Sequence, residues 1–336
     1  MDSTHLVVYL VVGFALVFDF ANGMNDAANA IATVVTTRVL SPTVAIIFGA
    51  VLNFVGAFWS DAVAKTIGTD IADPKLLTTT TFLAAVIAAP IWVFWCTIKG
   101  LPISCSHSLM GALIGSVLAS AGADALKSGG IIKIVKGVFT SPIAGFFVGM
   151  LIITLISWTF RRARPKTVHG IFGKLQIVSA GLMAFAHGTG DAQKAMGIIT
   201  GTLIAGGMID SHGGTEFHIP PWVRIACATA MGVGTAVGGW AVIKTLGSRL
   251  AHIRPFQGFA AETASAGTIL LNTHFGVPIS TTHSITGAIM GIGAANGMRT
   301  VRWGVGRKIV FAWLCTFPIC IGSGWLILHL LHFMGL

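Results

Sequence analysis

The chain has 336 residues, of which 54% are hydrophobic and only 10% charged; its formal net charge is +10 and its mean hydropathy +0.84. Because a soluble domain carries about a quarter charged residues, this composition excludes a soluble globular protein and indicates an integral membrane protein embedded in a lipid bilayer. The apolar runs have the length of about 20 residues that a spanning helix needs, and the strict alternation of a membrane barrel is absent. We interpret the positive charge as basic cytoplasmic loops rather than as a nucleic-acid surface.

Ten apolar segments are expected in chain order. The first, at about 5–38, has a polar interruption at 22–26, and the sixth, at about 172–206, has one at 187–191. We expect both helices to be broken at these points. The other eight segments are expected at about 41–60, 77–98, 102–120, 140–160, 222–246, 257–273, 278–296 and 307–332.

The first residues lack the basic region of a cleavable signal peptide, so we expect none to be removed. The loops are too short to bury a soluble core. The five cysteines lie in or near apolar segments without a C-x-x-C pair, and we interpret them as packing thiols.

The two halves of the chain resemble each other. The stretch GLPISCSHSLMGALIG at 100–115 aligns without a gap with GVPISTTHSITGAIMG at 276–291. Likewise NGMNDAANA at 22–30 aligns with HGTGDAQKA at 187–195, which places Asp26 opposite Asp191. The same motifs therefore recur in the same order, which indicates one ancestral unit used twice.

We expect a first repeat at 1–160, a basic cytoplasmic linker at 161–171 and a second repeat at 172–336. Placing basic loops inside puts the N-terminus outside, and five crossings in each half then invert the second copy. Inverted repeats are typical of secondary transporters. The fold class is thus an all-α, multi-pass protein of the cytoplasmic (inner) membrane, with about ten segments and room for re-entrant hairpins.

Loop charge supports this topology with one exception. The segment 207–221 has no Lys or Arg but contains Asp210 and Glu216. The loop 121–139 is the exception, because it carries three lysines and yet is placed outside. The segments rich in Lys and Arg are 161–174, 244–254 and 299–308.

The polar interruptions have a chemical interpretation. Lipid offers no hydrogen bonds, so irregular backbone at depth must be buried in protein or line a wet cavity. Intramembrane carboxylates are costly and functional by default, and amide and carboxylate oxygens suit sodium or a proton. Sodium, if bound, would use Asn25, Asp26 and Asn29. We assign cation coupling to Asn22, Asn25, Asp26, Asn29, Asp191 and Glu262.

A second pair of motifs suits an anion. Pro102 and Pro278 each open a cluster of hydroxyl residues, and a helix N-terminus that carries hydroxyls is a site for an oxyanion. Hydroxyls in membrane helices also bond back to their own backbone, but duplication at matching positions favours a binding site. The two histidines could instead bond neighbouring backbone or sense protons. The candidates are Ser104, Ser106, His107, Ser108, Ser280, Thr281, Thr282, His283 and Ser284.

The motifs GMNDAANA, GTGDAQKA, PISCSH and PISTTH resemble those of the inorganic phosphate transporter (PiT) family, of the bacterial low-affinity permease type. The four motifs stand in the order that the family has, and the resemblance covers nearly the whole chain. The resemblance implies a transporter, not an enzyme, that brings phosphate inward with a cation gradient. It also implies phosphate contacts for the hydroxyl segments and for Gln193 and Lys194, a family glutamate at Glu262, and a homodimer.

The sequence departs from the family pattern in its second signature. Gly190 stands where Asn is usual, and Lys194 replaces the Asn that Asn29 represents in the other half. An ammonium there would compensate Asp191 and leave fewer sodium ligands, which favours proton coupling. No cofactor is expected besides the co-transported H⁺ or Na⁺.

Four other functions remain as alternatives. Two are a sodium-coupled phosphate symporter and a sulfate permease of the same family. The others are an anion channel and a metal-dependent membrane enzyme; the enzyme is disfavoured because the chain has no H-E-x-x-H pattern.

Overall fold

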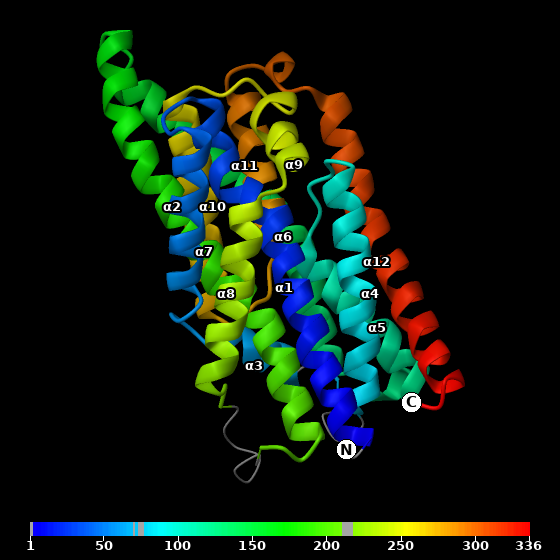
Figure 1. The fold of residues 1–336 in the computed structure, drawn as a ribbon. Helices are drawn as coiled ribbons and strands as arrows, with labels where there is room; N and C mark the ends of the chain where they lie inside the picture. The colour runs from blue at the N-terminus through cyan, green and yellow to red at the C-terminus, as the bar shows by residue number, and fades with distance from the viewer. Residues whose placement is uncertain (1–2, 70, 73–76, 210–217) are drawn as a thin grey trace.

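The computed structural model describes residues 3–69, 71–72, 77–209 and 218–336, which form a bundle of helices (Figure 1). Asp210 and Glu216, used above for topology, lie outside the described residues. Within the described ranges the only β-type pairings are two isolated bridges. The expectation of an all-helical protein is therefore confirmed.

Each of the ten expected apolar segments contains a helix, and the short α3 was not anticipated. The first half contains α1 (Ser3–Thr36), α2 (Pro42–Gly56), α3 (Ala62–Thr69), α4 (Thr79–Ile98), α5 (Cys105–Ser120) and α6 (Ser128–Thr159). The second half contains α7 (Pro165–Ala205), α8 (Pro221–Val237), α9 (Trp240–Lys244), the π-helical turn η3 (Thr245–Arg249), α10 (Pro255–His274), α11 (Thr281–Ala295) and α12 (Trp303–Phe333).

Five of the described helices are long and apolar enough to cross a membrane: α1, α4, α6, α7 and α12. A sixth span results if α8 and the following α9–η3 pair, bent by 60°, count as one. The helices α2 and α5 are apolar but shorter, with 15 and 16 residues. The chain is thus a multi-pass membrane protein, whereas ten crossings and their inversion stay predictions.

The prediction that the helices break at 22–26 and 187–191 is wrong. Both α1 and α7 run through their polar motifs without interruption. Their glycines serve close helix packing instead of unwinding: a Cβ added at Gly23 would lie 2.2 Å from the carbonyl oxygen of Met231, and one at Gly188 would lie 2.0 Å from that of Asn53. Neighbouring backbones occupy the space that a side chain would need, so the helix itself is kept.

The breaks occur instead before α5 and α11. After α4 and after α10 the chain turns at Gly100 (φ +68°) and Gly276 (φ +63°) and runs extended for a few residues before the next helix starts. Figure 1 shows α5 in the lower part of the bundle and α11 in the upper part. The two Pro-Ile-Ser segments therefore lead into the bundle from opposite ends.

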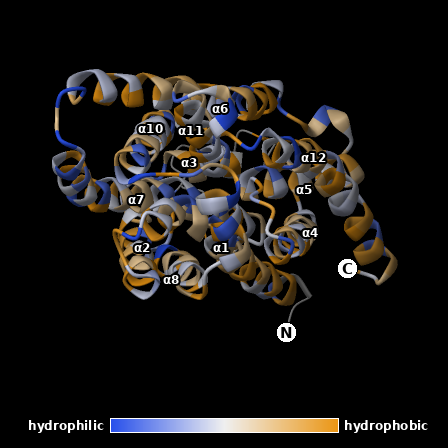
Figure 2. Ribbon diagram, turned by 90° about the horizontal axis from the view of Figure 1, so that it is seen from above, coloured by the Kyte–Doolittle hydropathy of each residue, from blue (hydrophilic) through white to orange (hydrophobic). Residues whose placement is uncertain are grey.

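The two halves interlock. Helix α6 packs on α11 of the other half, and α12 packs on α5. In the same way α1 packs on α8, and α7 packs on α2. Seen from above (Figure 2), α2, α7 and α8 lie on one side of α1, and α4, α5 and α12 lie on the other. The linker expected at 161–171 is partly helical, because α7 begins at Pro165; the division into two repeats stays a prediction.

Candidate functional site

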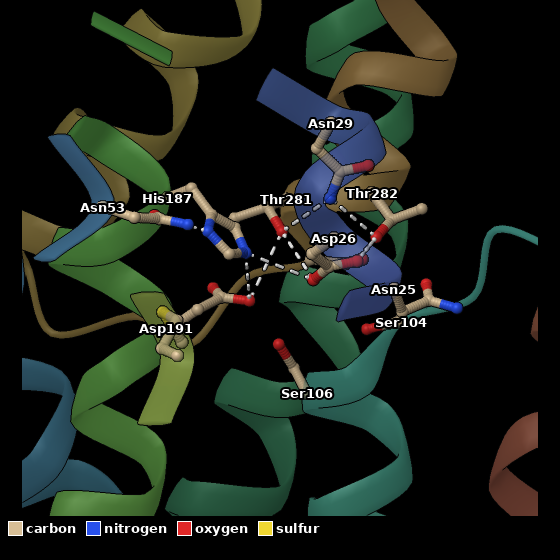
Figure 3. Close-up of polar contacts among 12 residues, drawn as sticks. Asn25, Asp26, Asn29, Asn53, Ser104, Ser106, His187, Asp191, Thr281 and Thr282 are labelled. Atoms are coloured by element: carbon tan, nitrogen blue, oxygen red, sulfur yellow. Dashed lines mark hydrogen bonds and ion pairs between the residues drawn. The ribbon is translucent and has the colours of Figure 1, made fainter. Parts of the chain in front are cut away.

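Three buried ionisable side chains meet where α1 and α7 cross the centre of the bundle. Asp26 comes from α1, and His187 and Asp191 come from successive turns of α7. The Nε2 atom of His187 lies 3.4 Å from Asp26 Oδ2 and 3.4 Å from Asp191 Oδ2 (Figure 3). One ligand atom of each residue lies within 4.8 Å of the others. This central cluster is the one place among the described residues where three such groups gather.

A lysine neutralises one of these carboxylates. Lys194 Nζ lies 2.6 Å from Asp191 Oδ1, and both side chains are buried. Along α7 the two residues are three apart, so they share one face of the helix. The second signature therefore brings its own cation to its aspartate, as the departure at Lys194 indicated.

His187 was not among the sequence-predicted site residues. Its Nδ1 lies 2.7 Å from Asn53 Oδ1, and the amide of Asn53 donates to the hydroxyl of Thr235 at 2.9 Å. Because the amide nitrogen donates there, the amide oxygen is the acceptor for His187, which places a proton on Nδ1 and turns Nε2 toward the carboxylates. Two signals existed in the sequence: His187 precedes Asp191 by one helical turn, and it aligns with Asn22.

The start of α11 completes the central cluster. Thr282 donates a hydrogen bond to Asp26 Oδ1 at 2.8 Å, and the hydroxyl of Thr281 lies 3.4 Å from Oδ2 of both aspartates. Asn29 donates to Thr282 at 3.0 Å and to Thr281 at 3.3 Å. The structure thus unites predicted cation-coupling residues with predicted anion-binding hydroxyls.

The two Pro-Ile-Ser motifs have matching local geometry. The Oγ atoms of Ser104 and Ser280 cap α5 and α11, each accepting from the backbone N–H three residues later at 3.1 Å. Ser108 and Ser284 each donate to the carbonyl four residues earlier, also at 3.1 Å. Ser106 donates to Ile279 O at 3.2 Å, and Figure 3 shows its hydroxyl pointing toward the two aspartates. The two helix starts therefore adjoin.

The motif histidines pack against each other. The ring centroids of His107 and His283 are 4.7 Å apart, with the rings roughly perpendicular. His283 also lies against Trp313, with centroids 3.8 Å apart, and His107 lies against Phe317 at 4.9 Å. This aromatic stack joins α5 and α11 just beyond their caps.

Glu262 lies apart from the central cluster. Its buried carboxylate accepts hydrogen bonds from the hydroxyls of Thr33 and Ser179 and, at 3.3 Å, from the amide of Gln176. Thr33 is two helical turns from Asp26 along α1, a rise of about 10 Å. The structure therefore gives Glu262 its own neutral hydrogen-bonding pocket.

Two other predicted residues lie near the cluster. Asn25 donates to the hydroxyl of Thr97 on α4 at 2.7 Å. Asn22 is fully buried, and its amide makes no hydrogen bond to any described residue.

Gln193 holds the start of α3. Its Oε1 accepts from the backbone N–H groups of Val63 at 2.8 Å and Ala64 at 3.1 Å. These are among the first N–H groups of α3, which have no partner within the helix. The side chain predicted to contact phosphate is thus engaged with a neighbouring helix.

This geometry predicts that Gln193→Leu loosens α3. Loss of the acceptor leaves two buried N–H groups unpaired, at a cost of about 1–3 kcal/mol each. We expect faster amide hydrogen exchange confined to Ala62–Thr69, measured by mass spectrometry in detergent. Gln193→Glu keeps an oxygen acceptor for both N–H groups and is the matched control. Unchanged exchange in Gln193→Leu would show that the cap does not hold α3.

A helical bundle that buries two aspartates, a histidine, a lysine and two hydroxyl-capped helix starts at its centre has the intramembrane ionisable groups that mark a substrate or ion pathway, as in a membrane transporter. Residues 22–170 and 160–324 match the Phosphate transporter family. The chain belongs to this family, which confirms the resemblance identified from its motifs.

Similar proteins agree with this assignment. The chain is 44% identical over 322 residues to a "Probable low-affinity inorganic phosphate transporter" of Rhizobium meliloti (strain 1021), covering 95% of each chain. It is 43% identical over 326 residues to the protein of the same name from Bacillus subtilis (strain 168), covering 96% of this chain and 97% of that one. A solved structure described as "The sodium-dependent phosphate transporter" has the same fold, with a TM-score of 0.91 at 23% identity, covering 98% of this chain and 99% of that one.

Proposed function

We propose that this protein imports inorganic phosphate across the cytoplasmic membrane by symport with protons, through alternating access around the central cluster. The observation that carries the proposal is the meeting of Asp26 and Asp191 with Thr281 and Thr282 at one fully buried point. These residues come from three helices in both halves of the chain. A site of this kind can exchange between the two membrane faces when the segments that close it at either end open in turn.

Two features suit phosphate. The adjoining starts of α5 and α11 direct N–H groups and serine or threonine hydroxyls toward one region, which is an arrangement that binds oxyanions. Phosphate at neutral pH also carries a proton that a carboxylate can accept, whereas sulfate does not. The aspartates that accept bonds from Thr281 and Thr282 therefore favour phosphate over sulfate.

The Lys194–Asp191 pair supports proton coupling. An ammonium at 2.6 Å from Asp191 occupies the space where a transported cation would bind in the second half. In the first half, Asp26 stands with Asn25 and Asn29, whose amide oxygens make no hydrogen bond to the described residues. These oxygens are the specific observation that keeps sodium coupling as the second candidate.

Alternating access requires two related halves. The packing of α6 on α11 matches that of α12 on α5, and the packing of α1 on α8 matches that of α7 on α2. This exchange of equivalent contacts supports an inverted repeat. Coupling then requires that anion and cation bind better together than alone, which the shared contacts of Asp26 with its threonines allow.

The test is uptake of radiolabelled phosphate into proteoliposomes under an imposed pH or sodium gradient, with excess sulfate as competitor. We expect saturable accumulation driven by an acidic exterior, without sodium and undiminished by sulfate. Accumulation only with sodium would show that the coupling ion is not the proton, and inhibition by sulfate would show that the substrate is not specifically phosphate. An internal phosphate concentration that never exceeds its equilibrium value would indicate a channel instead.

A further inference from the structure

Two glycine turns open the Pro-Ile-Ser segments in the same way. Leu101 N–H bonds to Cys96 O and Val277 N–H bonds to Asn272 O, both at 2.9 Å, across the turns at Gly100 and Gly276. Each glycine has positive φ, so the pattern is a Schellman motif that ends α4 and α10. The position of each glycine therefore sets where the following serine and threonine side chains enter the central cluster.

A threonine from a short helix binds the carbonyl of each glycine. Thr66 of α3 donates to Gly276 O at 2.9 Å, and Thr245 of η3 donates to Gly100 O at 2.8 Å. Both threonines are buried, with exposed fractions of 6% and 5%. Each bond crosses between the halves of the chain, since the short helix and the glycine come from different halves.

Each threonine also has a second acceptor on its own helix. Thr66 Oγ1 lies 3.2 Å from Ala62 O, and Thr245 Oγ1 lies 3.0 Å from Ala241 O. A hydroxyl has a single proton, so the two acceptors share it. When the glycine moves away, the hydroxyl keeps its partner four residues earlier. Such a bond can break and re-form without leaving a buried donor unpaired.

The short helices are attached to the helices that carry the aspartates. Gln193 of α7 caps α3, and a Cβ added at Gly197 of α7 would lie 2.6 Å from Ala64 O. At the other end, a Cβ added at Gly247 of η3 would lie 2.7 Å from Ala32 O of α1. Figure 1 shows α3 at the end of the bundle where both termini lie and α9, which leads into η3, at the opposite end.

We propose that Thr66 and Thr245 are positioning residues of the transport cycle, each releasing one Pro-Ile-Ser segment when the site opens to its own end of the molecule. The proposal rests on the alternating access proposed above. The bond from Thr66 to Gly276 closes the end with the termini, and the bond from Thr245 to Gly100 closes the other end. In this structure both bonds are formed and the central cluster is buried from both ends.

The test uses Cys105, a buried residue between Ser104 and Ser106, as a reporter of access to the site. The other cysteines (Cys96, Cys227, Cys315 and Cys320) are replaced by alanine. Labelling by a membrane-impermeant methanethiosulfonate is timed from each face of oriented vesicles. We expect Thr66→Val to speed labelling about 2- to 10-fold from the face with the termini, and Thr245→Val to do so from the opposite face.

Matched variants separate positioning from general loosening. Thr66→Ser and Thr245→Ser retain the hydroxyl. They should be labelled at the same rate as the parent, which is the protein with Cys105 as its remaining cysteine. Thr202→Val removes a buried hydroxyl whose one hydrogen bond among the described residues is to Ile198 O on its own helix, and it should change labelling from neither face. If both valine variants speed labelling from one face, or neither exceeds Thr202→Val, the proposal is wrong. If a valine variant does not fold, Thr66→Ala or Thr245→Ala takes its place, and its labelling rates from the two faces are compared in the same way.

Phosphate uptake by the parent is measured in the same vesicles. A parent that accumulates no phosphate refutes the proposed function. The labelling rates of Cys105 from the two faces test the roles of Thr66 and Thr245 independently of that result.

Discussion

Asp26→Asn is expected to lower the initial rate of phosphate uptake about 100-fold, a loss equivalent to about 2.7 kcal/mol. Asp26 accepts a hydrogen bond from Thr282, contacts Thr281 and lies 3.4 Å from His187. Its carboxylate on α1 therefore contacts both the start of α11 and α7. An asparagine keeps the volume but can neither carry a proton nor balance a cation. Uptake into proteoliposomes, normalised to the amount of reconstituted protein, measures the effect.

Asp191→Asn should have the same effect, because Thr281 lies 3.4 Å from both aspartates. The exposed Asp124, in the 3₁₀ turn after α5, offers a matched control, and Asp124→Asn should transport at the parental rate. Parental transport by both cluster variants would show that the cluster is not the coupling site.

Lys194→Met is expected to destabilise the folded protein by about 3–5 kcal/mol, because removal of one partner leaves a buried charge uncompensated. Lys194 is the nearest cation to Asp191, with His187 Nε2 further away at 3.4 Å. Unfolding in detergent, followed by intrinsic fluorescence during denaturant titration, measures the loss. Lys174→Met, at an exposed position on the same helix, is the control and should change stability little.

The double variant Asp191→Asn with Lys194→Met separates charge from packing. It removes both charges, so we expect it to recover most of the stability lost in Lys194→Met. No recovery would mean that the lysine acts through the packing of its aliphatic chain.

Lys194→Asn should in addition give sodium-stimulated uptake, because it restores in α7 the amide that Asn29 supplies in α1.

The interlocked arrangement of the halves bears on how they move. Since α6 and α12 each pack on the other half, the two halves of the chain cannot separate as rigid bodies without breaking large helix interfaces. The short α3 and the α9–η3 segment instead lie at opposite ends of the bundle, and Thr66 and Thr245 each donate one hydrogen bond to the glycine that opens a Pro-Ile-Ser segment. Local movement of these segments is therefore the smaller rearrangement.

The sequence alone determined the membrane class, the helical segments, the duplicated motifs and the family. These follow from local properties: apolar length identifies a spanning helix, and motif identity at matching positions pairs Asp26 with Asp191. The importance of Lys194 could also be predicted, because it replaces the asparagine that Asn29 represents and lies within one turn of Asp191.

The tertiary structure alone decided whether the glycine-rich motifs break their helices and which side chains converge. Gly23 and Gly188 are compatible with either outcome, and the backbones of Met231 and Asn53 decide for close packing. His187 and Asn53 are 134 positions apart, as Thr66 and Gly276 are 210 apart, so no local pattern signals their contact. Local composition controls insertion and helix formation, whereas the partners of a buried polar group depend on which distant helices the fold brings beside it.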